Sequence, residues 1–241
     1  MKKLLAMLLT LTLLFAFVAC NSNDEPKFDP SAKSEGVMTY AEYAAAAIDA
    51  PVVIEAFVQG NQSWWFDSDA GHGKITVYAQ DPDGAYFIYE MKCAEEDAAK
   101  ITKGAKIKVT GFKAEWSGEV EIVDATFEVL DGTWVAEATD VTELLGKEEL
   151  INKQNMLVSF KGLTVEGISY KDSEWDPDIY LAVNYNGASY SFCVENYLCG
   201  PDTDVYKTVA ALEAGDKIDV EGFLYWYEGV NTHITAVTVA E

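Results

Sequence analysis

Arginine is absent from this 241-residue chain, and all 17 of its basic side chains are lysines. They stand against 40 aspartates and glutamates, so the formal net charge is −23 at pH 7. Arginine forks and basic patches supply most contacts to phosphate groups, and a field of this sign repels a nucleic acid. Nucleic acid is therefore disfavoured as a partner, as is an anionic membrane surface. Cations, and neutral ligands that exchange hydrogen bonds, remain compatible with this composition.

Histidine and cysteine are scarce, which limits the available chemistry. The histidines occupy non-equivalent places, and the three cysteines beyond the N-terminal region lack the spacing of a zinc site; these residues are His72, His233, Cys93, Cys193 and Cys199. No G-x-S-x-G sequence and no phosphate-cradling loop occurs. We therefore expect no catalytic residue, no metal site, no cofactor and no enzymatic activity. The last two cysteines fit either a disulfide or small buried thiols.

A long apolar run occurs at the N-terminus. Lys2 and Lys3 precede a largely apolar stretch, 4–18, which is short for a bilayer crossing and has the order of an export signal. The sequence Phe17-Val18-Ala19-Cys20 that follows resembles the lipobox of bacterial lipoproteins, in which cleavage precedes a cysteine that becomes diacylated. A plain secretory signal is the alternative.

The lipobox resemblance implies a lipoprotein signal peptide over residues 1–19 and lipidation of Cys20. It also implies a mature protein that is held on the cell surface by an N-terminal lipid anchor in the membrane and does not span it. Residues 20–35 are polar and interrupted by proline, which predicts a flexible tether between the lipid and the folded part.

One strand–turn–strand unit is written twice, 111 positions apart. Residues 104–128 read GAKIKVTGFKAEWSGEVEIVDATFE, and residues 215–239 read GDKIDVEGFLYWYEGVNTHITAVTV. A period of domain length predicts two tandem copies of one fold, because the repeats of a solenoid are much shorter. We place the two domains at residues 36–131 and 132–241.

The expected order of elements is the same in both copies. A capping box at Thr39 and Glu42 opens a helix to about residue 48, and Asp140 begins a second helix that runs, with a break at Gly146, towards residue 153. A further short helix is expected at 95–101 in the first copy and at 204–212 in the second. Strands are expected at 52–58, 75–78, 86–90, 105–113 and 119–130, and again at 156–165, 179–183, 190–194, 216–225 and 231–239.

Five strands with a helix between the third and fourth is the order of the OB-fold, a small Greek-key barrel. The sequence G-x-K-I-x-V-x-G-F, followed by an aromatic residue and a glycine, resembles the fourth-to-fifth strand segment of OB-fold domains in bacterial cell-surface lipoproteins and exported nucleases. The predicted fold class is therefore mainly β, with two tandem five-stranded OB-fold barrels, each with short helices. Such barrels bind oligonucleotides, oligosaccharides, peptides or nothing.

Two acidic loops occupy equivalent places in the copies. Asp67 and Asp69 begin like a calcium loop, but Tyr78 stands where the closing glutamate belongs. Asp172, Glu174, Asp176 and Asp178 repeat the alternation of acids. We interpret both as solvated loops, with calcium binding as the alternative.

Aromatic residues gather in the loops that flank the binding face of an OB barrel. The candidate ligand-binding residues are Trp64, Trp65, Phe66, Trp116, Trp175, Tyr225, Trp226 and Tyr227. Tryptophan and tyrosine beside carboxylates suit sugars, because the ring stacks on the apolar face of a pyranose and the acids accept hydroxyl protons. Trp116 and Tyr227 share one register of the repeat, which is also typical of residues that close the barrel.

The sequence predicts a non-enzymatic, lipid-anchored extracytoplasmic binding protein. It is expected to recognise a neutral ligand such as a glycan, or a protein partner. The alternative is a structural module of a cell-envelope assembly, with its loop aromatics buried between the barrels. Single-stranded nucleic acid binding ranks third, because the fold permits it and the charge opposes it.

Overall fold

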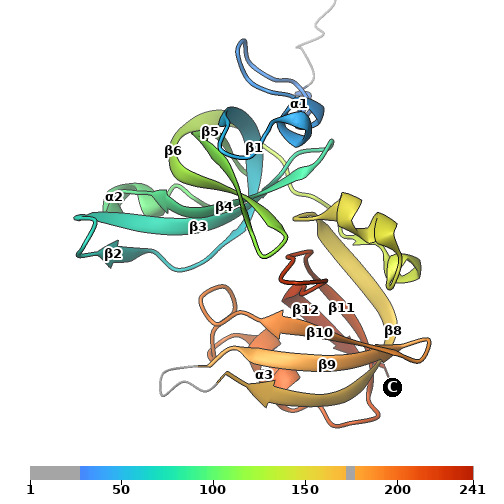
Figure 1. The fold of residues 1–241 in the computed structure, drawn as a ribbon. Helices are drawn as coiled ribbons and strands as arrows, with labels where there is room; N and C mark the ends of the chain where they lie inside the picture. The colour runs from blue at the N-terminus through green and yellow to red at the C-terminus, as the bar shows by residue number, and fades with distance from the viewer. Residues whose placement is uncertain (1–27, 172–176, 241) are drawn as a thin grey trace, which may run out of the picture.

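A computed structural model describes residues 28–171 and 177–240, which form two β-domains joined by a short connection (Figure 1). The predicted signal peptide 1–19, the predicted lipidation site Cys20 and the candidate residue Trp175 lie outside the described residues. Among the residues that the structure describes, the helices are too short or too polar for a membrane crossing.

The first domain is a closed sheet. Its strands are β1 (Pro51–Asn61), β2 (Trp65–Asp67), β3 (His72–Gln80), β4 (Ala85–Lys92), β5 (Ala105–Trp116) and β6 (Glu119–Thr133). The order is β1-β5-β6-β4-β3-β2, and an additional pairing of β1 with β3 closes the barrel. All pairings are antiparallel except β4 with β6. Helix α1 (Tyr40–Ala45) precedes the sheet, and α2 (Glu95–Ala98) lies between β4 and β5.

The second domain repeats this arrangement. Its strands are β7 (Thr139–Asp140), β8 (Leu157–Tyr170), β9 (Ile179–Tyr185), β10 (Ala188–Val194), β11 (Lys217–Phe223) and β12 (His233–Val239), with α3 (Asp204–Ala210) between β10 and β11. The order is β11-β12-β10-β9-β8-β7, closed by a pairing of β11 with β8. Strands β10 and β12 are parallel, like β4 and β6. The fold prediction of two tandem OB-like domains is confirmed, with short β2 and β7 added to the five expected strands.

Two local expectations meet different outcomes. The capping box forms as predicted, since the Thr39 side chain accepts from the Glu42 backbone N–H and the Glu42 carboxylate accepts from the Thr39 backbone N–H. The helix expected from Asp140 is broken at Gly146 as predicted, but its two parts are 3₁₀ segments, η1 (Thr142–Leu144) and η2 (Glu148–Lys153). Gly146 separates them with φ at +78°, a left-handed backbone that ends one helical segment before the next begins.

Each barrel has its own apolar core, and a third cluster joins the two domains. The third cluster contains Tyr78 and Phe87 of the first domain and Leu157 and Phe223 of the second. Tyr78 and Phe223 stack at 4.4 Å with their planes 13° apart. The Tyr78 hydroxyl also lies 2.6 Å from Nδ1 of His233. Residues on strands that are far apart in sequence therefore hold the two barrels against each other.

The connection and the described end of the N-terminal segment also contact the barrels. Strand β6 continues to Thr133, two residues past the expected end of the first domain. The backbone N–H of Ala136 then donates to Gln59 Oε1 at 2.9 Å. Within the segment expected to be a tether, Phe28 contacts Phe57 edge-on at 5.9 Å, and the Lys33 ammonium donates to the carbonyl of Glu55 at 2.7 Å.

Candidate ligand-binding cleft between the two domains

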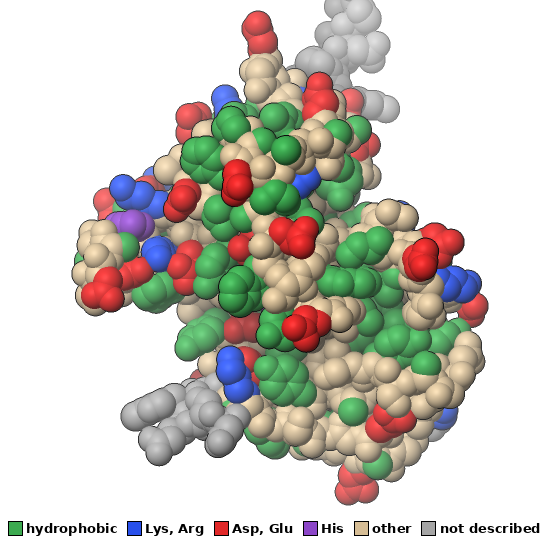
Figure 2. All heavy atoms as spheres, in the orientation of Figure 1, with side chains coloured by type: hydrophobic (Ala, Val, Ile, Leu, Met, Phe, Trp, Pro, Cys, Tyr) green, Lys and Arg blue, Asp and Glu red, His purple; other side chains and the backbone are tan. Residues whose placement is uncertain are grey.

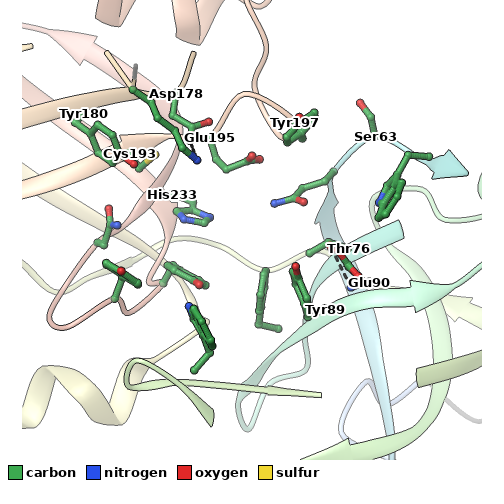
Figure 3. Close-up of a pocket in the computed structure, with 18 of the residues that line it drawn as sticks. Ser63, Thr76, Tyr89, Glu90, Asp178, Tyr180, Cys193, Glu195, Tyr197 and His233 are labelled. Atoms are coloured by element: carbon green, nitrogen blue, oxygen red, sulfur yellow. Dashed lines mark hydrogen bonds and ion pairs between the residues drawn. The ribbon is translucent and has the colours of Figure 1, made fainter. Parts of the chain in front are cut away.

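A cleft of about 1030 Å³ lies where the two domains face each other. The second and third strands of an OB barrel, with the loops that follow its first and fourth strands, form the face that holds ligands. In the first domain these strands are β3 and β4, and in the second they are β9 and β10. Both faces contribute to the one cleft, because Thr76, Tyr89, Tyr180 and Cys193 all line it. Figure 3 shows labelled residues of the two domains facing one another across this space.

Five of the eight aromatic residues proposed from the sequence line the cleft: Trp64, Trp65, Trp116, Tyr225 and Tyr227. Trp65, Trp116 and Tyr227 are 43%, 60% and 48% exposed, so about half of each side chain is open to solvent. Phe66 is 59% exposed but is not part of the cleft wall, and neither is Trp226.

Two of the tryptophans have clear structural roles. The indole of Trp64 donates to the carbonyl oxygen of Cys93 at 3.0 Å and lies against the backbone of Gly73, where an added Cβ would meet Nε1 at 2.4 Å. Trp226 is half-buried against the core of the second domain and lies over Gly118 in the turn of the first. Trp64 therefore shapes the cleft wall, whereas Trp226 packs outside it.

Several lining residues were not proposed from the sequence. Tyr89 and Tyr180 lie within strands, Tyr197 follows β10, and His233 begins β12. Tyr225 stacks on His233 with ring centroids 4.2 Å apart, and its ring meets that of Phe87 edge-on at 5.2 Å. The alternation of a strand places Tyr89 and Tyr180 on the binding faces once the strands are known, but the opposition of the two faces has no local signal in the sequence.

The charged groups of the cleft wall are mostly acidic. Glu90, Asp178 and Glu195 line it, with Lys171 as the one lysine among the described lining residues. The Lys171 ammonium lies 3.5 Å from a carboxylate oxygen of Asp178. Burial raises the pKa of Glu195 to about 7, even though the backbone N–H groups of residues 197 and 198 act in the opposite direction. Figure 2 shows acidic side chains over both domains on one face of the molecule, with fewer basic ones.

Burial controls the charge of His233 as well. Complete burial lowers the pKa of its imidazole to about 3, so the ring is neutral at physiological pH. A neutral imidazole beside the Tyr78 hydroxyl and under the Tyr225 ring forms part of the domain contact. The side chain is held in place by both domains and is not a free base.

Two glutamates of β6 lie behind the aromatic wall. Glu119 is fully buried, and its Oε2 accepts from the backbone N–H of Trp226 at 2.8 Å and from the Gln154 amide at 3.1 Å. Its Oε1 has no hydrogen-bond partner among the described residues. Burial raises the pKa of Glu119 to about 8 and, together with the charge of Glu90, that of Glu121 to about 7.

The acidic loop of the first domain is a turn held by its own side chains. Asp67 accepts from the backbone N–H groups of Asp69 and Ala70 and forms an ion pair with Lys74 at 2.7 Å. Asp172, Glu174 and Asp176 of the second acidic loop lie outside the described residues. Within 28–171 and 177–240, no group of three or more His, Cys, Asp or Glu side chains is arranged to hold a metal ion.

The cysteines of the described chain are free thiols. Cys93 and Cys193 are buried and Cys199 is half-buried, and no disulfide joins the last two. Of the two readings that the sequence left open, the structure has the buried thiols. Burial raises the pKa of each thiol, which disfavours the reactive thiolate.

The fold and the cleft define a class: a protein of two tandem OB-like domains whose ligand-holding faces meet. No protein-family model matches the chain, and no curated protein matches it. Solved structures do resemble it, at low identity. A murine DNA binding protein bound with double-stranded DNA has a TM-score of 0.36 and 13% identity, covering 78% of this chain and 94% of that one.

Two further structures show similar likeness. The p204 HINb domain has a TM-score of 0.34 and 13% identity, over 77% of this chain and 95% of that chain. A replication protein A heterotrimer bound to single-stranded DNA has a TM-score of 0.35 and 12% identity, over 82% of this chain and 51% of that one. The likeness is one of fold.

These comparisons correct the functional ranking made from the sequence. A neutral glycan or a protein partner was placed first there, and nucleic acid was disfavoured because of the net charge. The similar structures include proteins bound to double-stranded and to single-stranded DNA, which contradicts that order. The physical reason is that net charge describes the whole surface and does not describe the local side chains of one face.

Proposed function

We propose that the protein is a binding protein without catalytic activity, and that the cleft between its domains holds a ligand with a flat ring. The observation that carries the proposal is the set of half-exposed aromatic rings around one cleft that both OB faces share. Trp65, Trp116 and Tyr227 are each roughly half exposed there, although burial of such rings is favourable. A ring that stacks on them removes apolar surface from water on both partners.

Single-stranded nucleic acid is a second candidate, favoured by the fold together with these rings. Bases stack on aromatic side chains in OB-folds at about 1–3 kcal/mol per base. Basic groups near the cleft are already paired, since Lys171 contacts Asp178 and Lys74 contacts both Asp67 and Glu90. Stacking would therefore supply the affinity, and added salt should strengthen binding of a strand by screening its repulsion from the acidic protein.

Titration calorimetry with adenosine and with a ten-nucleotide deoxyadenosine strand tests both candidates. Binding should weaken about tenfold or more in Trp116→Ala and Tyr227→Ala, because each change removes a stacking surface. Phe66→Ala is the matched control, since this ring is equally exposed but lies outside the cleft wall. The proposal would be contradicted if neither probe binds. It would also be contradicted if Phe66→Ala weakens binding as much as Trp116→Ala and Tyr227→Ala do.

We further propose that the protein is anchored outside the cytoplasmic membrane through lipidated Cys20. The support is the N-terminal sequence: two lysines, a short apolar run and Ala19-Cys20. Cys20→Ala should abolish acylation and move the protein from the membrane to the soluble fraction, as followed by labelling with a fatty-acid analogue and by fractionation. A variant that stays membrane-bound like the unchanged protein would refute the anchor.

A further inference from the structure

The charge of the cleft wall restricts what a stacking ligand can carry. Its acids come from both domains, with Glu90 on β4 and Glu195 directly after β10. Glu90 already forms an ion pair with Lys74 at 2.8 Å, which leaves Glu195 as the acid without a paired lysine. Lys171 is paired with Asp178, so no unpaired ammonium balances Glu195 among the described lining residues. The surrounding molecule adds a negative field, because the chain as a whole has a formal charge of −23.

A second, independent observation comes from β6. Glu121 is only 8% exposed, yet its carboxylate makes no hydrogen bond and no ion pair with any residue in 28–171 or 177–240. It pairs in register with Phe87, so the two side chains share a face of the sheet, and Phe87 lines the cleft. Tyr225 lies over Phe87 on this same side. Burial desolvates the Glu121 carboxyl group, which disfavours its charged form unless a positive charge comes near it.

Aromatic rings and carboxylates together form an environment that favours organic cations. The face of a tyrosine or tryptophan ring attracts a cation through its quadrupole, and the attraction increases when the site is desolvated. The structure has one internal example, because the Lys74 ammonium lies 5.3 Å from the ring centroid of Trp65 at the edge of the cleft. The same carboxylates would repel an anionic ligand.

We propose that the cleft selects a small organic cation, with its flat ring stacked on the exposed aromatic side chains and its positive charge facing Glu195. This inference rests on the proposed stacking cleft and adds the sign of the ligand's charge. A bound cation would also favour ionisation of Glu195, whose pKa burial has raised to about 7. Glu121 contributes from behind the wall, through the field rather than by contact.

Three probes of one shape and different charge test the sign directly. They are 1-methylnicotinamide, nicotinamide and nicotinate, which carry one positive charge, no charge and one negative charge. In titration calorimetry of the purified protein we expect the cation to bind at least tenfold more tightly than nicotinamide, and nicotinate more weakly than either. Added salt should weaken binding of the cation and leave nicotinamide unchanged.

Two variants separate the cleft from the general field. Glu195→Gln should reduce the affinity for 1-methylnicotinamide about tenfold and leave nicotinamide unchanged. Glu213→Gln removes one exposed acid that is not part of the cleft wall, and we expect less than a twofold effect. Because Glu195 also accepts from the backbone N–H of Leu198, thermal melting of the variant checks that the turn persists.

The outcomes distinguish this inference from the proposed function. Equal binding of all three probes would overturn the charge selection and leave the stacking cleft intact. Tighter binding of nicotinate, or of a deoxyadenosine strand, than of the cation would overturn it in favour of an anionic ligand. If neither the three probes nor adenosine bind, the stacking cleft and the charge selection both fail.

Discussion

Glu119 should make the stability of the protein depend on pH in a defined direction. Its carboxyl group is fully buried at the junction of the domains, and burial raises its pKa from an ordinary value of 4.5 to about 8. Between these pH values the folded protein keeps a proton that the unfolded chain has released. The resulting stability is fully present below pH 4.5 and is lost as pH rises through about 8.

The magnitude follows from one bound proton. In that window the free energy of unfolding falls by about 1.4 kcal/mol per pH unit, so it should drop by about 3 kcal/mol between pH 5 and pH 7.5 from this group alone. Glu119→Gln removes the titration and keeps a side-chain oxygen that can accept from the backbone N–H of Trp226. The variant should therefore gain about 3 kcal/mol relative to the unchanged protein over this interval.

Urea unfolding measured from pH 5 to pH 9 provides the assay, with the variant and the unchanged protein compared at each pH. Subtraction cancels the titration of Glu121 and Glu195, which both proteins keep. Glu115→Gln is the control, because this glutamate lies on the preceding strand and is exposed. Parallel curves for Glu119→Gln and the unchanged protein would show that the carboxyl group does not hold its proton in the folded state, and the reasoning would be refuted.

Three further predictions follow from the packing. Phe223→Ala should lower the free energy of unfolding by about 3–5 kcal/mol, because it removes the buried ring that stacks on Tyr78. Urea unfolding measures this change, and a loss below about 1 kcal/mol would contradict the prediction. Lys113→Met should lower the free energy of unfolding by about 2–4 kcal/mol, since the Lys113 ammonium donates to three backbone carbonyls at the end of α1. A variant with an unchanged melting temperature would argue against this role. Residues 36–131 and 132–241, expressed separately, should each unfold cooperatively in calorimetry, with lower stability than in the whole chain because the junction is exposed; two molten halves would refute domain independence.

Much of the fold could be predicted because it depends on short-range signals. The repeat at 111 positions defines two copies, since equal sequences prefer equal structures. Alternating apolar residues and turn glycines placed the strands to within a few residues, as for the hairpin of β3 and β4. The break at Gly146 in the helix expected from Asp140 was predicted, but the segments on either side of it are 3₁₀ turns rather than α-helix.

The cleft depends on contacts that no local pattern contains. The amino-acid sequence alone was sufficient to predict the tandem OB architecture, the acidic character and the segments that contain Trp65, Trp116 and Tyr227, although Trp65 begins β2 and Trp116 ends β5 instead of lying in loops. The opposition of the two OB faces depends on long-range packing, because it follows from the stack of Tyr78 on Phe223. Burial produced by this packing also determines which carboxyl groups hold protons. Desolvation depends on the atoms that surround a side chain in the folded protein and not on its neighbours in sequence.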